Sequence, residues 1–162
     1  LLVAGCAINP RERTLPPSIR TVSVPMFLNR TAEPGLEEGA TVLAQKEFLA
    51  DGRLNLVSHR EADAIIEVTL ENFDSQATSR DSDDFARQRR MTVDAKINIV
   101  RNQPGRPVFG GTRSVSAAHT FINDKRRIAY VTEPEAREEL LRDLARKVVR
   151  EVLTGEYEDS VE

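Results

Sequence analysis

Residues 91–99 read M-T-V-D-A-K-I-N-I, and apolar side chains alternate with polar ones along the whole stretch. The apolar positions are Met91, Val93, Ala95, Ile97 and Ile99. Successive side chains of a strand point to opposite faces of its sheet, so this period of two predicts a β-strand with one buried face and one face in water. A sheet that is covered on one side only is typical of antiparallel pairing.

Segments on both sides of this strand predict the rest of the sheet. Residues 62–73 alternate in the same way and predict a second long strand, whereas residues 19–26 and 54–57 predict shorter ones. The polar residues 75–84 predict the turn that joins the two long strands.

A further strand is expected after the turn-forming residues 102–105, over residues 107–121. Gly110 and Gly111 fall within it, and glycine inside a strand often marks a bulge. The sequence therefore predicts a bulged strand that returns along residues 91–99.

Two segments carry apolar residues at the spacing of a helix. The first covers residues 36–49, with Pro34 suited to the first helical position and Gly52 suited to the C-terminal cap. The second follows Thr132, a preferred N-cap residue, and its apolar stripe reaches Val152. Because each element has one apolar side, the elements must pack together. We expect an α+β fold, a two-layer sandwich with two helices packed on one face of a mostly antiparallel four- to five-stranded sheet.

The first six residues, L-L-V-A-G-C, join an apolar run to small residues and then to Cys6, the single cysteine of the chain. This pattern resembles the lipobox of bacterial lipoproteins, in which the signal is cut before the cysteine and the new N-terminus carries acyl groups such as palmitate. The alternative is a buried strand whose cysteine acts as a small apolar side chain. Ala7, rather than aspartate, follows Cys6, which in such lipoproteins favours delivery to the outer membrane. We therefore expect a lipid anchor on the periplasmic side of that membrane.

This interpretation divides the chain into four parts. Residues 1–5 are expected to be a remnant of the lipoprotein signal peptide, and the proline-rich residues 6–18 a lipidated tether. Residues 19–154 are expected to form a single α+β domain, and residues 155–162 an acidic flexible tail.

Composition and motifs argue against several classes of site. A net charge of −3 disfavours nucleic acid as a partner. One cysteine and two histidines cannot form an internal disulfide or a zinc site. No glycine-rich phosphate loop, nucleophile elbow or metal-binding histidine pair is present, so we expect no cofactor. His119 lies near Ser114 and Ser116, but a catalytic triad needs a third group, and we interpret it as an ordinary strand histidine. The carboxylates of residues 81–84 lack the glycine and glutamate of a calcium loop.

Basic residues form two groups along the sequence. One group surrounds the predicted hairpin turn, and the other follows the last strand: Arg80, Arg87, Arg89 and Arg90, then Lys125, Arg126 and Arg127. They can be a solvated surface that balances the acidic helices. The alternative is that they bind phosphate, because arginine forms paired, charge-assisted hydrogen bonds with it. The sequence does not tell whether the two groups lie at the same end of the sheet.

The order of the segments resembles the LptE family of lipopolysaccharide-assembly lipoproteins. The segments are V-P-M-F-L-N-R-T (residues 24–31), E-P-G-L-E-E (33–38), D-G-R-L-N-L-V (51–57), A-D-A-I-I-E-V-T-L (62–70) and A-R-E-E-L-L-R-D-L-A-R-K-V-V (136–149). The resemblance implies a non-enzymatic outer-membrane lipoprotein that plugs the large β-barrel LptD in a 1:1 complex, helps it to assemble, and takes part in lipopolysaccharide transport. It also implies lipopolysaccharide contacts in the hairpin and in the loop before the last helix, where this chain has Arg80 and Arg87, and Lys125, Arg126 and Arg127.

Two other function classes remain open at this stage. The segment at residues 24–31 is also similar to the first strand of the curli-secretion lipoprotein, which would make the chain an envelope or secretion-channel adaptor that forms oligomers. A membrane-tethered hydrolase is the third class, and the sequence offers no assembled catalytic site for it.

Overall fold

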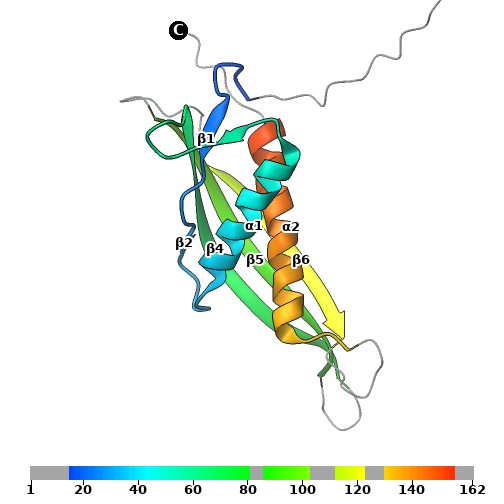
Figure 1. The fold of residues 1–162 in the computed structure, drawn as a ribbon. Coiled ribbons are helices and arrows are strands. Elements are labelled where there is room, and N and C mark those ends of the chain that lie inside the picture. Colours follow the sequence, from blue (N-terminus) through cyan, green and yellow to red (C-terminus); the bar gives the residue numbers. More distant parts are fainter. Residues whose placement is uncertain (1–14, 81–85, 103–111, 123–129, 156–162) are drawn as a thin grey trace, which may run out of the picture.

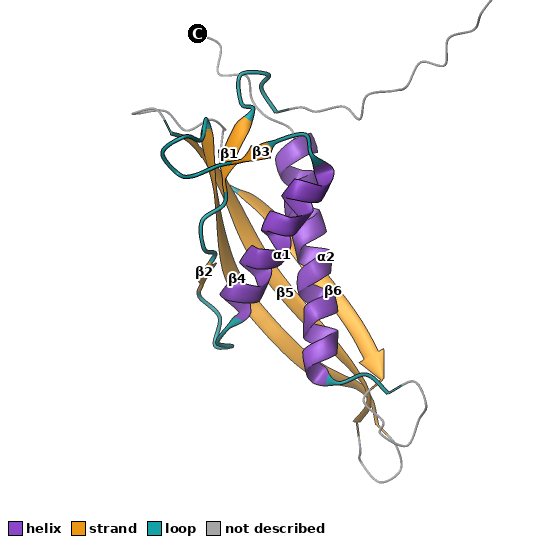
Figure 2. Cartoon of the chain, viewed as in Figure 1, coloured by secondary structure: helices purple, strands orange, loops and turns teal. Residues whose placement is uncertain are grey.

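The computed structural model describes residues 15–80, 86–102, 112–122 and 130–155. Two helices lie side by side against one face of a long, twisted sheet (Figures 1 and 2). The elements in chain order are β1 (Thr21–Ser23), β2 (Leu28–Asn29), α1 (Leu36–Asp51), β3 (Asn55–Leu56), β4 (Ala64–Arg80), β5 (Ala86–Arg101), β6 (Arg113–Ile122) and α2 (Glu133–Thr154). The predicted α+β class and the two helices are confirmed.

Within the described residues the sheet has six strands and is mixed, which corrects the expectation of a mostly antiparallel sheet of four to five strands. Its order is β3-β1-β4-β5-β6, and β2 also pairs with β4. The pairs β4–β5 and β5–β6 are antiparallel, whereas β1, β2 and β3 pair in parallel. The physical reason lies in α1, which connects the β1–β2 region to β3 and brings the chain back in the same direction, as a crossover helix does.

The central hairpin is longer than the sequence indicated. Residues 75–80, expected as part of a turn, continue β4, and Ser75 pairs with Met91 while Arg80 pairs with Ala86. Polar side chains do not end a strand here because backbone bonds to β5 continue beyond the apolar core. The register shifts between Leu70 and Asn72, so β4 carries a bulge at that point. The bulge predicted at residues 110–111 falls outside the described residues.

Both helices have defined ends. α1 begins at Leu36 rather than at Pro34, and it ends as predicted at Gly52, whose φ of 72° is a conformation that glycine adopts without strain. The N-cap of α2 is Thr132, as predicted: its hydroxyl accepts from the Glu135 amide and the Glu135 carboxylate accepts from the Thr132 amide. Within the described residues, neither helix is both long and apolar enough to cross a membrane.

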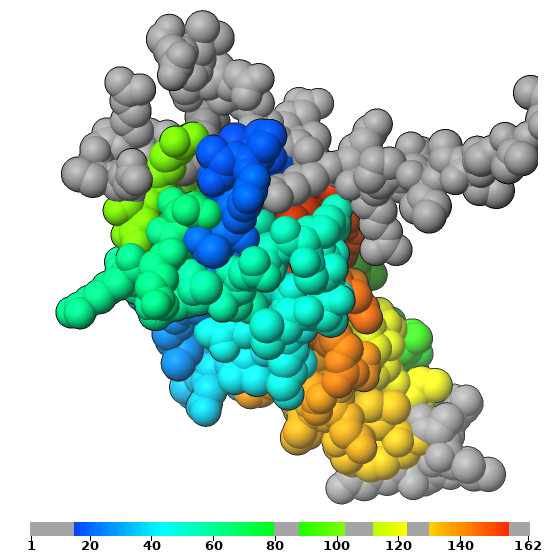
Figure 3. All heavy atoms as spheres, turned by 45° about the horizontal axis from the view of Figure 1, so that its top comes forward, coloured from blue at the N-terminus to red at the C-terminus, as the bar shows by residue number. Residues whose placement is uncertain are grey.

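The core lies between the helices and the sheet. The alternating residues predicted for β5 are all buried, together with the matching face of β4 and the stripe of α2. Gly39 lets α1 approach α2 closely, because a Cβ there would lie 3.1 Å from the Leu141 Cδ1 atom. Leu15, inside the predicted tether, is only 2 % exposed and joins this core, so the domain begins before residue 19. Figure 3 shows the two helices adjoining on the outer surface.

Candidate functional site

Two of the five basic residues expected to bind lipopolysaccharide, Arg80 and Arg87, lie in strands at one end of the sheet. Arg80 is the last residue of β4, and Arg87 follows the first residue of β5. Their side chains lie outside the described part of the structure, as do Lys125, Arg126, Arg127 and Cys6 entirely. What the structure does establish is the position of the strand and helix ends from which these residues continue.

The described strand and helix ends next to these residues converge. Gln88 near the start of β5 pairs with Ile122 at the end of β6, next to the Arg80–Ala86 end of the hairpin. The Val131 amide donates to the Ile122 carbonyl at 3.1 Å, so the segment between them starts and finishes at one point. α2 begins immediately afterwards. We call this the distal end of the domain, the lower end in Figure 1.

An arginine lies on the inner face of the sheet near the distal end. Arg89 occupies the helix-facing side of β5, opposite Ala77 on β4 and Phe121 on β6. One terminal nitrogen, Nη2, donates to the Ser75 hydroxyl at 3.0 Å and to the Ser75 carbonyl at 3.3 Å, while its Nε is buried without a hydrogen-bond partner. Extending the alternation of residues 91–99 by two residues towards the N-terminus predicts that Arg89 points inward.

A second arginine connects three elements of the domain. Arg137 on α2 pairs with the carboxylate of Glu33, which precedes α1, and its guanidinium lies 5.9 Å from the centre of the Phe73 ring on β4. The pair is about one-third exposed, so it positions the loop before α1 more than it stabilises the fold. Sequence reasoning missed Arg137 because it lies within a regular run of charges on α2.

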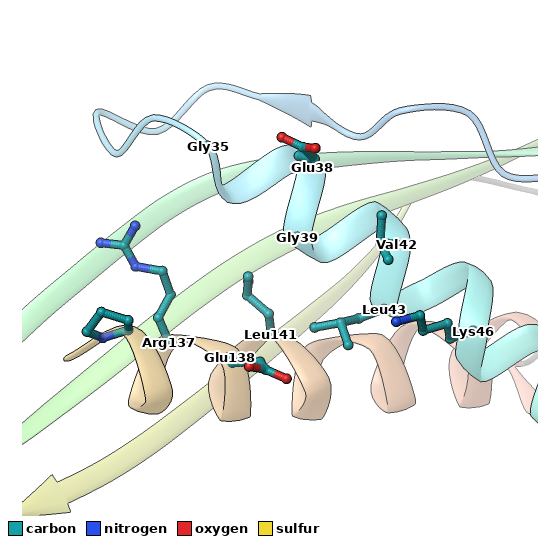
Figure 4. Close-up of a pocket in the computed structure, with 10 residues that line it drawn as sticks. Gly35, Glu38, Gly39, Val42, Leu43, Lys46, Arg137, Glu138 and Leu141 are labelled. Atoms are coloured by element: carbon teal, nitrogen blue, oxygen red, sulfur yellow. The ribbon is translucent and has the colours of Figure 1, made fainter. Parts of the chain in front are cut away.

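A groove of about 430 Å³ follows the outer boundary between α1 and α2. Figure 4 shows Leu141 directed from α2 towards Gly39, with Leu43 between the helices and the charged Glu38, Lys46, Arg137 and Glu138 around the rim. On α1, Val42 is 43 % exposed and Leu49 is 66 % exposed. The rim carries two acids and two bases, so the groove does not select a ligand by charge.

The face of the sheet turned away from the helices is polar and has no covering layer within the described residues. Side-chain pairs cross its strands, including Lys96 with Glu71 at 2.7 Å and Asn98 with Glu67 at 3.1 Å. We call this surface the open face. Its polar composition is compatible with contact to a polar wall.

Three carboxylates have perturbed titration for local reasons. Backbone amides of Arg20 and Thr21 donate to Asp63 and lower its pKa. The Thr132 amide and hydroxyl lower the pKa of Glu135 in the capping box. The Glu37 backbone amide lowers the pKa of its own carboxyl group, with a further contribution from the amide of Asn29. All three carboxylates accept local hydrogen bonds in caps and turns, so their lowered pKa values reflect a structural role. Within the described residues, no group of His, Cys, Asp and Glu side chains is arranged to hold a metal ion.

The comparisons with known proteins agree with this architecture. The profile of the lipopolysaccharide-assembly family LptE matches residues 19–154. The chain belongs to the LptE family. No curated protein is detectably similar to it in sequence.

Solved structures with this LptE fold are distant in sequence. A hypothetical protein from Chlamydia trachomatis has a TM-score of 0.60 at 9 % identity and covers 83 % of this chain and 95 % of its own. A minor lipoprotein from Acinetobacter baumannii has a TM-score of 0.53 at 14 % identity and covers 83 % and 90 %. Rare lipoprotein B from Shewanella oneidensis has a TM-score of 0.50 at 9 % identity and covers 81 % and 92 %. At these identities the similarity concerns the fold.

Proposed function

We propose that this LptE-family protein is a lipid-anchored plug of an LptD-type outer-membrane β-barrel, and that it takes part in lipopolysaccharide transport without catalysing a reaction. The observation that carries the proposal is the family match over nearly the whole domain. Acyl groups on Cys6 would hold the protein at the periplasmic leaflet, since several acyl chains anchor stably where a single one is marginal.

The open face supports a place inside a barrel. Large outer-membrane barrels have a polar lumen that must be filled if it is not to leak. The open face presents paired polar side chains, such as Lys96 with Glu71, to whatever lies opposite. A one-to-one plug is the stoichiometry that this arrangement favours.

The distal end supports lipopolysaccharide binding. Lipid A carries phosphates, and arginine and lysine bind phosphate through charge-assisted hydrogen bonds. The elements leading to Arg80 and Arg87, and the two anchored ends of the loop that contains Lys125, Arg126 and Arg127, meet at this end. We assign these five residues to the headgroup of lipopolysaccharide.

The first test is affinity purification from detergent-solubilised outer membranes, with the bound proteins identified by mass. A stoichiometric large β-barrel is the expected result. A self-oligomer without a barrel would overturn the plug proposal and favour the oligomeric adaptor instead.

The lipopolysaccharide site is tested by charge reversal of Arg80, Lys125, Arg126 and Arg127 to glutamate together. We expect at least a tenfold loss of affinity for purified lipopolysaccharide, with the barrel complex retained. For a matched control, Arg80→Glu alone is compared with Arg101→Glu, which changes the net charge by the same amount, because Arg101 is exposed at the opposite end of β5, opposite Ala64. Equal losses in both variants would reduce the effect to net charge and refute a site at the distal end.

A further inference from the structure

β6 forms one border of the sheet. It pairs with β5 along residues Arg113–Ile122, and none of the described strands pairs with its other side (Figure 2). A strand edge of this length is a template for another strand, and proteins usually protect such an edge with proline, charge or a covering segment. Residues 113–122 contain no proline and one formal charge, on Arg113.

The direction of the backbone groups in β6 follows from the hydrogen bonds around it. In an antiparallel pair, alternate residues bond to the neighbouring strand and the others point away from it. The Ile122 carbonyl accepts from Val131, outside the sheet, so the even-numbered residues of β6 point outward. The pairing of β4 gives the same result. The Leu70 carbonyl accepts from the Arg30 amide and therefore points away from β5, and following the pairing from β4 through β5 to β6 again leaves the even-numbered residues of β6 pointing outward.

Four consecutive outward positions are therefore available to a partner. They are Ser114, Ser116, Ala118 and Thr120, and all four residues are exposed. Within the described part of the chain, the backbone groups of Ser114, Ala118 and Thr120 have no hydrogen-bond partner on this side. Unpaired amides and carbonyls at strand spacing define the chemistry of the occupant, which is an extended polypeptide.

One side chain protects this edge in a reversible way. Lys147 on α2 donates from Nζ to the Ser116 carbonyl at 2.9 Å and pairs with Asp143 at the same distance. The lysine side chain is one-third exposed, so it can leave the carbonyl for water or for Asp143 when a strand arrives. An edge lysine of this kind opposes uncontrolled pairing without blocking a specific partner.

We propose that the outer edge of β6 binds an extended segment of the β-barrel partner by strand addition, through the backbone of residues 114–120. This inference rests on the proposed function, because the partner is the barrel. The wall strands of a closed barrel are already paired with one another, so the added segment must come from a part of the barrel chain outside its wall. The small side chains of Ser114, Ser116, Ala118 and Thr120 let that backbone approach. These side chains lie on the open face, so strand addition continues the surface that meets the lumen.

Amide hydrogen exchange at residue resolution tests the proposal on the full chain, free and in the purified barrel complex. In the free protein we expect fast exchange at the four outward residues and slow exchange at the inward Val115, Ala117, His119 and Phe121. In the complex the outward amides should slow by at least a hundredfold. A stoichiometric complex in which they still exchange fast overturns the inference and leaves the proposed function intact. The absence of any barrel complex would overturn both.

A backbone variant gives an independent readout. Ala118→Pro removes an outward N–H and leaves the bonds to β5, a position where proline is tolerated in an edge strand. We expect it to weaken the barrel complex at least tenfold, while Ala118→Thr, which keeps the N–H, does not. Equal affinity of the two variants would overturn strand addition. Protection of the outward amides in the free protein at high concentration would assign the edge to a second copy and overturn the barrel as occupant. The exchange measurement stands even if the proline variant does not fold.

Discussion

The hydroxyl of Thr41 holds the segment between β1 and β2 against α1, and its removal is predicted to cost about 2 kcal/mol of unfolding free energy. Thr41 is 4 % exposed, and its Oγ1 accepts from the Phe27 amide at 2.9 Å and donates to the Glu37 carbonyl at 2.6 Å. Thr41→Val keeps the shape of the side chain, and valine and threonine have similar helix propensities. The cost therefore comes from the Phe27 N–H, which would be buried without an acceptor.

Urea unfolding measures this cost, and amide exchange at Phe27 localises it. In a domain of this size, about 2 kcal/mol corresponds to a fall in melting temperature of roughly 6 °C. Thr41→Ser is the matched control, because it keeps the hydroxyl and loses one methyl group worth about 1 kcal/mol. The valine variant should therefore be the less stable of the two, and it alone should show faster exchange at Phe27.

A Thr41→Val variant as stable as the unsubstituted protein, or a Phe27 amide that exchanges equally slowly in both, would refute this role of the Thr41 hydroxyl. Either result would mean that the apolar packing of Phe27, which is 2 % exposed, holds this segment without the hydrogen bond.

Three further predictions follow from single contacts. Gly39→Ala should change stability by less than about 1 kcal/mol in thermal unfolding, because the gain in helix propensity offsets the contact with Leu141, whereas Gly39→Leu should destabilise by about 1–3 kcal/mol through overpacking. Asp63→Asn should lower the unfolding free energy at neutral pH by about 1 kcal/mol and should flatten the acid side of its pH dependence. The pKa of Asp63 is lowered in the folded state, so this carboxylate contributes stability above its unfolded pKa of about 4, and the contribution is lost as pH falls through the folded pKa. Lys147→Met should raise self-association in sedimentation velocity with little change in stability, because it uncovers the edge of β6; an unchanged sedimentation coefficient at high concentration would contradict a protective role.

Alternation was sufficient to predict the long strands, and helical spacing was sufficient for α1 and α2. Neither pattern could predict how the short strands pair. β1 has three residues, and β2 and β3 have two each, so none is long enough to show a period. Their parallel pairing depends on where α1 returns the chain, which is a tertiary effect. For this reason the sheet was expected to be mostly antiparallel and is mixed.

The basic groups were visible in the sequence, but the convergence of the described strand and helix ends next to them was not. Their relation depends on the register of β5 with β6, in which Gln88 meets Ile122. Arg137 was missed because its partners, Glu33 and Phe73, are far away in sequence. Arg89 could have been placed on the inner face, because it lies two residues from Met91 and therefore on the same side of the strand. A polar residue that continues the series of inward positions thus indicates that the apolar core is ending.

This change of composition explains how one sheet can combine a stable domain with an adaptable end. From Ile99 to Met91 the inner face of β5 is apolar and buried, but one step further the inward residue is Arg89, opposite Ala77. Within the described residues beyond that point, Thr78, Ser79 and Gln88 are exposed and the two strands remain paired through their backbones. Regions with little apolar burial open locally at lower free energy than a core. Under the proposed function, residues at the distal end can rearrange around a bound lipopolysaccharide headgroup without loosening the helix-covered core. Charge reversals at the distal end should then alter binding while leaving the global unfolding free energy nearly unchanged.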